Sequence, residues 1–173
     1  MKHWNKYLIV FVVLLISPLA QAHNDHITVG FVAGLSHPFS GIDHLLALVL
    51  AGLFVGRLIT KRRVAIGFLL FALGLGISGA LLMGVQAGME TAILISIPVF
   101  VAVQWLTQSV QVKVAFATIS LFMVSHGWMH GIELAGMHNS FVFGLLLASA
   151  VVLSLSGLLG SIIKSKRITL SHA

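Results

Sequence analysis

Five long apolar segments constrain what this chain can fold into. They lie at about 41–60, 64–84, 90–108, 114–133 and 139–163. A helix needs about 20 apolar residues to cross the hydrocarbon core of a bilayer, and each segment is about that long. Hydrophobic residues make up 58% of the 173 residues and charged residues only 8%, far from the averages of a soluble domain. We therefore predict an all-α, polytopic membrane helix bundle with about five transmembrane helices.

The N-terminus has the pattern of a secretory signal peptide. The basic residues Lys2 and Lys6 precede an apolar core, and a small-x-small motif, Ala-Gln-Ala, follows it. This pattern predicts a signal peptide over 1–22 and a mature transmembrane domain over 23–173. An uncleaved first helix is the alternative. Cleavage would leave His23 with a free amine, and an amine and its own imidazole can together chelate a metal ion.

A short apolar segment from Ile27 to Ser36 precedes the five long ones. It is too short to cross a bilayer alone. We expect His37 and Pro38 to break it from the segment that follows, because the residue before a proline disfavours helical backbone. The segment is therefore predicted to be an N-terminal half-helix.

The charge pattern predicts a topology and argues against a nucleic-acid partner. The formal net charge is +6, but the basic residues flank the apolar segments and do not form one binding face. Three groups, at 61–63, 113 and 164–167, fall on one side of the membrane only if five spans follow an exported N-terminus. We therefore expect an external mature N-terminus and a cytoplasmic C-terminus. The chain has no cysteine, which excludes disulfides and thiolate metal sites.

Two motifs place imidazoles and carboxylates at the ends of apolar segments. The first is His-Pro-Phe-Ser-Gly-Ile-Asp-His at 37–44, and the second is His-Gly-Trp-Met-His-Gly-Ile-Glu at 126–133. Ionisable groups at membrane depth are costly and usually functional. The spacing i, i+4, i+7 puts His126, His130 and Glu133 on one helix face.

The predicted topology brings these polar residues to one mouth. At a rise of about 1.5 Å per residue, His44 and His126 should lie at similar depth below an outer rim. Imidazole nitrogen and carboxylate oxygen suit nickel, cobalt or zinc. Asp43 either binds the ion or orients a ligating imidazole. The candidate metal-binding residues are His23, His37, Asp43, His44, Glu90, His126, His130 and Glu133.

Both motifs resemble those of the HupE/UreJ group of nickel or cobalt permeases. The matching patterns are His-Pro-x-x-Gly-x-Asp-His-Leu-Leu-Ala at 37–47 and His-Gly-x-x-His-Gly-x-Glu at 126–133. The family's polar positions fall on His37, Asp43, His44, Glu90, His130 and Glu133, with His126 completing the second motif. Leu48 stands where the pattern leads us to expect Met.

The resemblance implies a multi-pass permease of the bacterial inner membrane that takes up nickel or cobalt. The ion would be a transported substrate and not a resident cofactor. We expect no enzyme activity, and without a Walker motif this chain alone should not hydrolyse ATP. The sequence leaves open the choice between nickel and cobalt, the energy source and the oligomeric state.

Two alternatives follow from the same histidines. Paired imidazoles on facing helices can ligate haem axially, but the carboxylates would then be unexplained. An intramembrane metalloprotease is the other alternative. His126 and His130 have the i, i+4 spacing of such a site, but the chain lacks a His-Glu-x-x-His motif.

Overall fold

The computed structural model describes residues 30–84, 88–106, 111–133 and 139–171, and this part of the chain forms six α-helices and no strands. The helices are α2 (Phe31–Ser40), α3 (Ile42–Leu58), α4 (Arg62–Met83), α5 (Met89–Leu106), α6 (Val112–Glu133) and α7 (Asn139–Ser171). The fold class predicted from the sequence, a helical bundle, is therefore confirmed for the described residues. The predicted signal peptide at 1–22 and His23 lie outside them.

The helices from α3 to α6 follow their apolar segments within a few residues, and α7 begins where the fifth segment begins. Not all of these helices are long enough to cross a membrane alone. Three qualify by length and hydropathy: Arg62–Met83, Val112–Ile132 and Asn139–Ile163. Helix α3 has 17 residues, or about 25 Å of rise, which is shorter than a hydrocarbon core of about 30 Å. It qualifies only as a bent pair with α2, while α5 contains a shorter apolar helix, Thr91–Gln104. The count of five spans therefore remains a prediction.

The predicted break at His37 and Pro38 is wrong in position. Helix α2 continues through Pro38 to Ser40, and the chain bends by 84° between α2 and α3. A proline in a helix removes one backbone hydrogen bond, and the last turn of α2 is supported by the Ser40 hydroxyl, which donates to the His37 carbonyl at 2.7 Å. The helix ends where Gly41 adopts extended backbone (φ −110°, ψ 118°).

Helices α4 and α6 run parallel and meet through glycines. A Cβ atom on Gly127 would fall on the carbonyl oxygen of Leu73. A Cβ on Gly131 would come within 2.6 Å of the Cβ of Ala80. Backbones approach this closely only where no side chain separates them. The glycines of the second motif therefore allow the close approach of α4 and α6.

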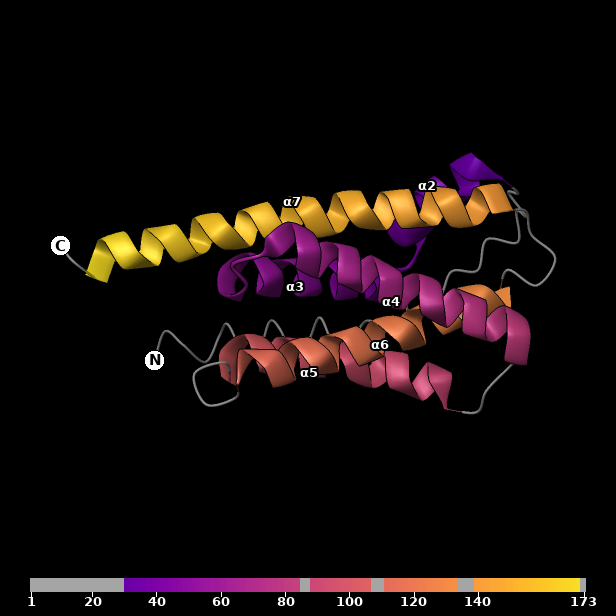
Figure 1. Ribbon diagram of the computed structural model, residues 1–173, viewed down its shortest axis with the longest axis horizontal. Coiled ribbons are helices and arrows are strands. Elements are labelled where there is room, and N and C mark those ends of the chain that lie inside the picture. The colour runs from indigo at the N-terminus through magenta and orange to yellow at the C-terminus, as the bar shows by residue number, and fades with distance from the viewer. Residues whose placement is uncertain (1–29, 85–87, 107–110, 134–138, 172–173) are drawn as a thin grey trace.

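Helix α7 packs against both halves of the bent pair. It runs in the same direction as α3, since Gly52 lies against Leu153 and, four residues later in both helices, Gly56 lies against Gly157. It also packs closely against α2, where a Cβ on Gly34 would fall on the Phe141 carbonyl oxygen. Figure 1 shows α7 on one side of the bundle and α5 and α6 on the other, with α3 and α4 between them.

Helix α7 is longer than the sequence predicts, with 33 residues continuing to Ser171. It extends past the other helices towards the C-terminus (Figure 1). The basic stretch that follows Ile163 contains neither Gly nor Pro, and Lys and Arg are good helix formers. The apolar run therefore ends at Ile163, but the helix continues beyond it.

The helix directions gather basic residues at one end of the bundle. Arg57 lies in the last turn of α3, Arg62 begins α4, and Lys113 lies in the first turn of α6. These helix ends lie together at the left of Figure 1. Arg57 Nη1 donates to Gln104 Oε1 at 3.0 Å, which ties α3 to α5 there. The residues of both histidine motifs lie at the opposite end.

An apolar cluster fills the space between α3, α4, α5, α6 and α7. Its fully buried side chains include Phe54, Leu69, Phe100, Ile119 and Leu153. Large apolar side chains on the outward surfaces are exposed, such as Leu82 at 87%. An apolar outer surface is expected where lipid, and not water, surrounds a bundle.

Candidate metal centre

Four histidines from three helices form a row at one end of the bundle. His37 comes from α2, His44 from the first turn of α3, and His126 and His130 from the end of α6. Ring centroids are 4.8 Å apart between His37 and His130, and 4.5 Å apart between His130 and His44. His44 and His126 follow at 5.4 Å. His44 and His126, which we expect from the sequence to lie at similar depth, are thus neighbours in the row.

The first two imidazoles of the row are joined by a hydrogen bond. His37 Nε2 lies 3.1 Å from His130 Nδ1. One of these nitrogens must carry a proton and the other must accept it. A proton and a metal ion cannot occupy the same lone pair, so an ion that binds either nitrogen has to open this bond.

The carboxylate of Asp43 lies next to the row of imidazoles. Its Oδ1 atom lies 3.7 Å from Nδ1 of the adjacent His44. That distance is too long for a hydrogen bond but short enough for a charge to act. The Asp43 side chain is 31% exposed and that of His44 15%. The carboxylate is therefore placed to attract a cation or to stabilise charge on the first imidazole of α3.

His126 ends the row inside the bundle. It is 3% exposed, and its Nε2 lies 2.9 Å from the hydroxyl oxygen of Ser96 on α5. Ser96 is fully buried and also donates to the Ile93 carbonyl at 2.7 Å. Buried polar groups are costly unless they are hydrogen-bonded, and Ser96 satisfies this requirement for the innermost imidazole.

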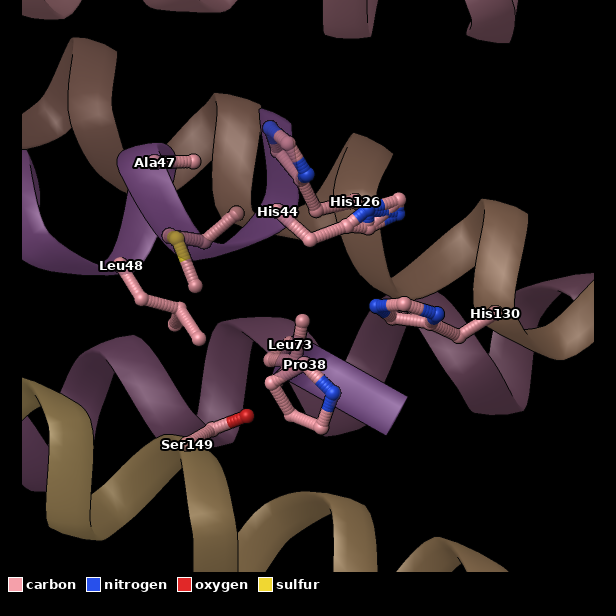
Figure 2. Close-up of a pocket in the computed structure, with 9 residues that line it drawn as sticks. Pro38, His44, Ala47, Leu48, Leu73, His126, His130 and Ser149 are labelled. Carbon is pink, nitrogen blue, oxygen red and sulfur yellow. The ribbon is translucent and has the colours of Figure 1, made fainter. Parts of the chain in front are cut away.

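A small cavity of about 10 Å³ lies against three of the four imidazoles. This is roughly the space of one water molecule. Its lining is formed by Pro38, His44, Ala47, Leu48, Leu73, Met123, His126, His130 and Ser149. Figure 2 shows the histidines and Ser149 on different sides of this cavity, with the Ser149 hydroxyl oxygen pointing towards Pro38. The cavity can hold a single water molecule or ion but no larger ligand.

The described histidines do not form one closed metal site. Among the residues that the structure describes, no three His, Asp or Glu side chains are grouped closely enough to hold one metal ion. Glu90 lies in the first turn of α5 and Glu133 ends α6, but their side chains lie outside the described part of the chain. Neighbouring pairs of imidazoles are thus the arrangement that a cation would meet.

Two serines of the site were not singled out from the sequence. Ser96 and Ser149 lie within apolar segments, outside both histidine motifs. Each is almost completely buried, at 0% and 1% exposure. A serine in an apolar helix usually donates a hydrogen bond to the backbone of its own helix. Only contacts with other helices therefore distinguish Ser96 and Ser149 from the other serines of the chain.

Comparison with known proteins supports the grouping suggested by the motifs. The family model described as HupE / UreJ protein matches residues 11–173. The chain is 32% identical to protein HupE of Rhizobium leguminosarum bv. viciae over 154 residues, which cover 86% of this chain and 80% of that protein. No solved structure matches the chain. On the extent of both matches, the chain belongs to the HupE/UreJ family.

Proposed function

We propose that this protein takes up a divalent transition metal ion, nickel or cobalt, across the bacterial inner membrane. One observation carries the proposal: four imidazoles from three helices meet at one end of an apolar bundle. The HupE/UreJ family, which is associated with nickel and cobalt transport, supports the same role. Imidazole nitrogen is a favourable ligand for both ions.

The row of imidazoles suits passage better than storage. Transport requires a site that binds an ion well enough to admit it and weakly enough to release it. Neighbouring pairs of imidazoles offer two nitrogens at a time, so an ion would exchange ligands stepwise from His37 and His130 to His44 and His126. Opening the bond between His37 and His130 is the first step. We propose that Glu90 and Glu133 attract the ion at the rim.

The direction of transport in this proposal follows from the charge distribution. Basic residues gather at the end of the bundle opposite the histidines, and basic loops favour the cytoplasm. The histidine row would therefore open to the periplasm. A cation would enter next to Asp43 and leave near the basic end, with the mature N-terminus outside and the C-terminus inside.

Haem binding is less well supported. The cavity beside His44 and His126 is about 10 Å³, whereas pockets for cofactors and other small molecules measure several hundred Å³. A porphyrin between these rings would require the helices to separate widely. A metal ion needs no such rearrangement.

Uptake of radiolabelled nickel and cobalt by cells that express the chain tests the proposal. We expect uptake of at least one ion above that of cells without the protein, and no uptake by the His44→Ala and His130→Ala double variant. Membrane levels of both proteins are compared by immunoblot. Equal uptake by the wild type and the double variant, at equal protein levels, would contradict a role for the histidine row.

A further inference from the structure

Ser96 is in contact with the histidine row although it belongs to neither motif. Its hydroxyl oxygen lies 2.7 Å from the Ile93 carbonyl oxygen and 2.9 Å from His126 Nε2. The side chain is fully buried in α5, and His126 is buried in α6. The contact joins a helix without a motif histidine to the innermost imidazole of the row.

The contact to Ile93 favours one arrangement of the protons. A carbonyl oxygen only accepts, and the Ser96 hydroxyl donates to the Ile93 carbonyl at 2.7 Å. With its single proton in that bond, the hydroxyl oxygen accepts from His126, and this arrangement puts a proton on Nε2 of that imidazole. A neutral imidazole has one N–H, so its Nδ1 atom keeps the lone pair. Only a nitrogen with a lone pair can bind a metal ion.

Other buried serines show that the contact to His126 is additional to ordinary packing. Ser120 of α6 donates to the Phe116 carbonyl at 2.8 Å, and Ser156 of α7 donates to the Val152 carbonyl at 2.6 Å. A bond to the preceding turn is therefore enough to satisfy a buried serine in this bundle. Ser96 has such a bond to Ile93 and uses its acceptor capacity for His126 as well.

We infer that Ser96 is a positioning residue that fixes the tautomer of His126 and presents its Nδ1 atom to the transported ion. The inference rests on the proposed function, because it concerns how one imidazole of the row meets the ion. In this role, Ser96 takes part in metal transfer through a hydrogen bond to an imidazole and not as a ligand itself. Groups that orient ligating imidazoles typically change metal affinity by about 10 to 100-fold when removed.

Nitrogen NMR of the full chain in nanodiscs tests the tautomer without metal. Histidine is labelled with ¹⁵N, and His126 is assigned from the signal lost in a His126→Gln variant. At about pH 8.5, two units above the ordinary pKa of imidazole, we expect the wild-type His126 to carry its proton on Nε2. Ser96→Ala should give a mixture of tautomers, whereas Ser96→Thr keeps the hydroxyl and should restore the single form.

Ser120→Ala is the matched control, because it also removes a buried serine hydroxyl but one bonded only to backbone in the described contacts. It should leave the His126 signal unchanged. A wild-type His126 with its proton on Nδ1 would overturn the inference. A signal that is identical in the wild type and Ser96→Ala would overturn it as well.

Cobalt binding then separates this inference from the proposed function. We expect Ser96→Ala to weaken Co²⁺ binding by about 10 to 100-fold. The wild type, Ser96→Thr and Ser120→Ala should bind Co²⁺ with the same affinity as one another. Unchanged affinity in Ser96→Ala would contradict the positioning role. If the wild type bound neither cobalt nor nickel while Ser96→Ala still changed the tautomer, the proposed function would fail and the hydrogen-bonding role of Ser96 would stand.

Discussion

His37 and His130 are 93 residues apart in the chain, and Nε2 of the first lies 3.1 Å from Nδ1 of the second. This hydrogen bond joins the short helix α2 to the end of α6, across the bend between α2 and α3. Both nitrogens are occupied by the same shared proton. A cation that approaches the row from this side must therefore compete with the hydrogen bond between its first two imidazoles.

Replacement of His130 by Ala should abolish metal uptake. Its ring lies between those of His37 and His44, at centroid distances of 4.8 and 4.5 Å, so its loss interrupts the row. Met129→Leu, a volume-conserving change at the adjacent position, serves as the control and should transport normally. Radiolabelled uptake at matched membrane levels is the measurement. Near-normal uptake by His130→Ala would rule out stepwise transfer through this imidazole.

Asp43→Asn tests whether the carboxylate acts through its charge. The side chain keeps its size but loses the negative charge that lies 3.7 Å from His44 Nδ1. We expect metal affinity to fall by roughly 10 to 100-fold, the usual scale for loss of a group that supports a ligating imidazole. Binding is measured by titration of the purified protein with nickel or cobalt.

Asp43→Glu is the matched variant, because it restores the carboxylate at a slightly different reach. Partial recovery of affinity in Asp43→Glu is expected if the charge matters. If Asp43→Asn binds the ion as tightly as the wild type, the Asp43 carboxylate has no part in binding. Glu90 and Glu133 would then be the carboxylates that attract the ion.

The sequence predicts the helices and the motif histidines well because both depend on local patterns. Apolar length located α4 and α6 within a few residues, and the helical rise placed His44 and His126 at similar depth. The break in the first motif was misplaced because Pro38 weakens a helix without necessarily ending it, whereas the extended backbone that bends the chain lies at Gly41. Ser96 was missed because its role depends on a contact with another helix, and an apolar segment gives no sign of that partner.

Gly127→Ala should destabilise the bundle because α4 and α6 touch at this position. The new Cβ would fall on the Leu73 carbonyl oxygen, so the two backbones would have to separate. Overpacking of this kind typically costs about 1–3 kcal/mol. Thermal unfolding in detergent measures the loss. Gly74→Ala is the control, since nothing lies within 4 Å of a Cβ at that position, and its stability should match that of the wild type.

Because Gly127 lies between His126 and His130, the same variant should also reduce metal uptake. Displacement of α6 moves both rings relative to His44, which approaches them from α3. A Gly127→Ala protein with the stability and uptake of the wild type would contradict the close packing of α4 against α6.

Cysteine labelling tests the proposed orientation of the histidine row. The chain has no native cysteine, so a single introduced thiol reports one position. Asn139 begins α7, and position 165 is 26 residues further along the same helix, or about 39 Å at 1.5 Å per residue, enough to place them on opposite sides of a membrane. An impermeant thiol reagent is applied to cells whose outer membrane is permeabilised and whose inner membrane is intact. Under these conditions, Asn139→Cys should react with the reagent and Ser165→Cys should not.

Both variants should react once the inner membrane is also permeabilised, which controls for buried thiols. The expected pattern places the end of the bundle with His37 and His130 on the periplasmic side, because α6 ends and α7 begins at that end. Reaction of Ser165→Cys alone in cells with an intact inner membrane would reverse the orientation. The histidine row would then face the cytoplasm, and a cation would meet it last on the way in.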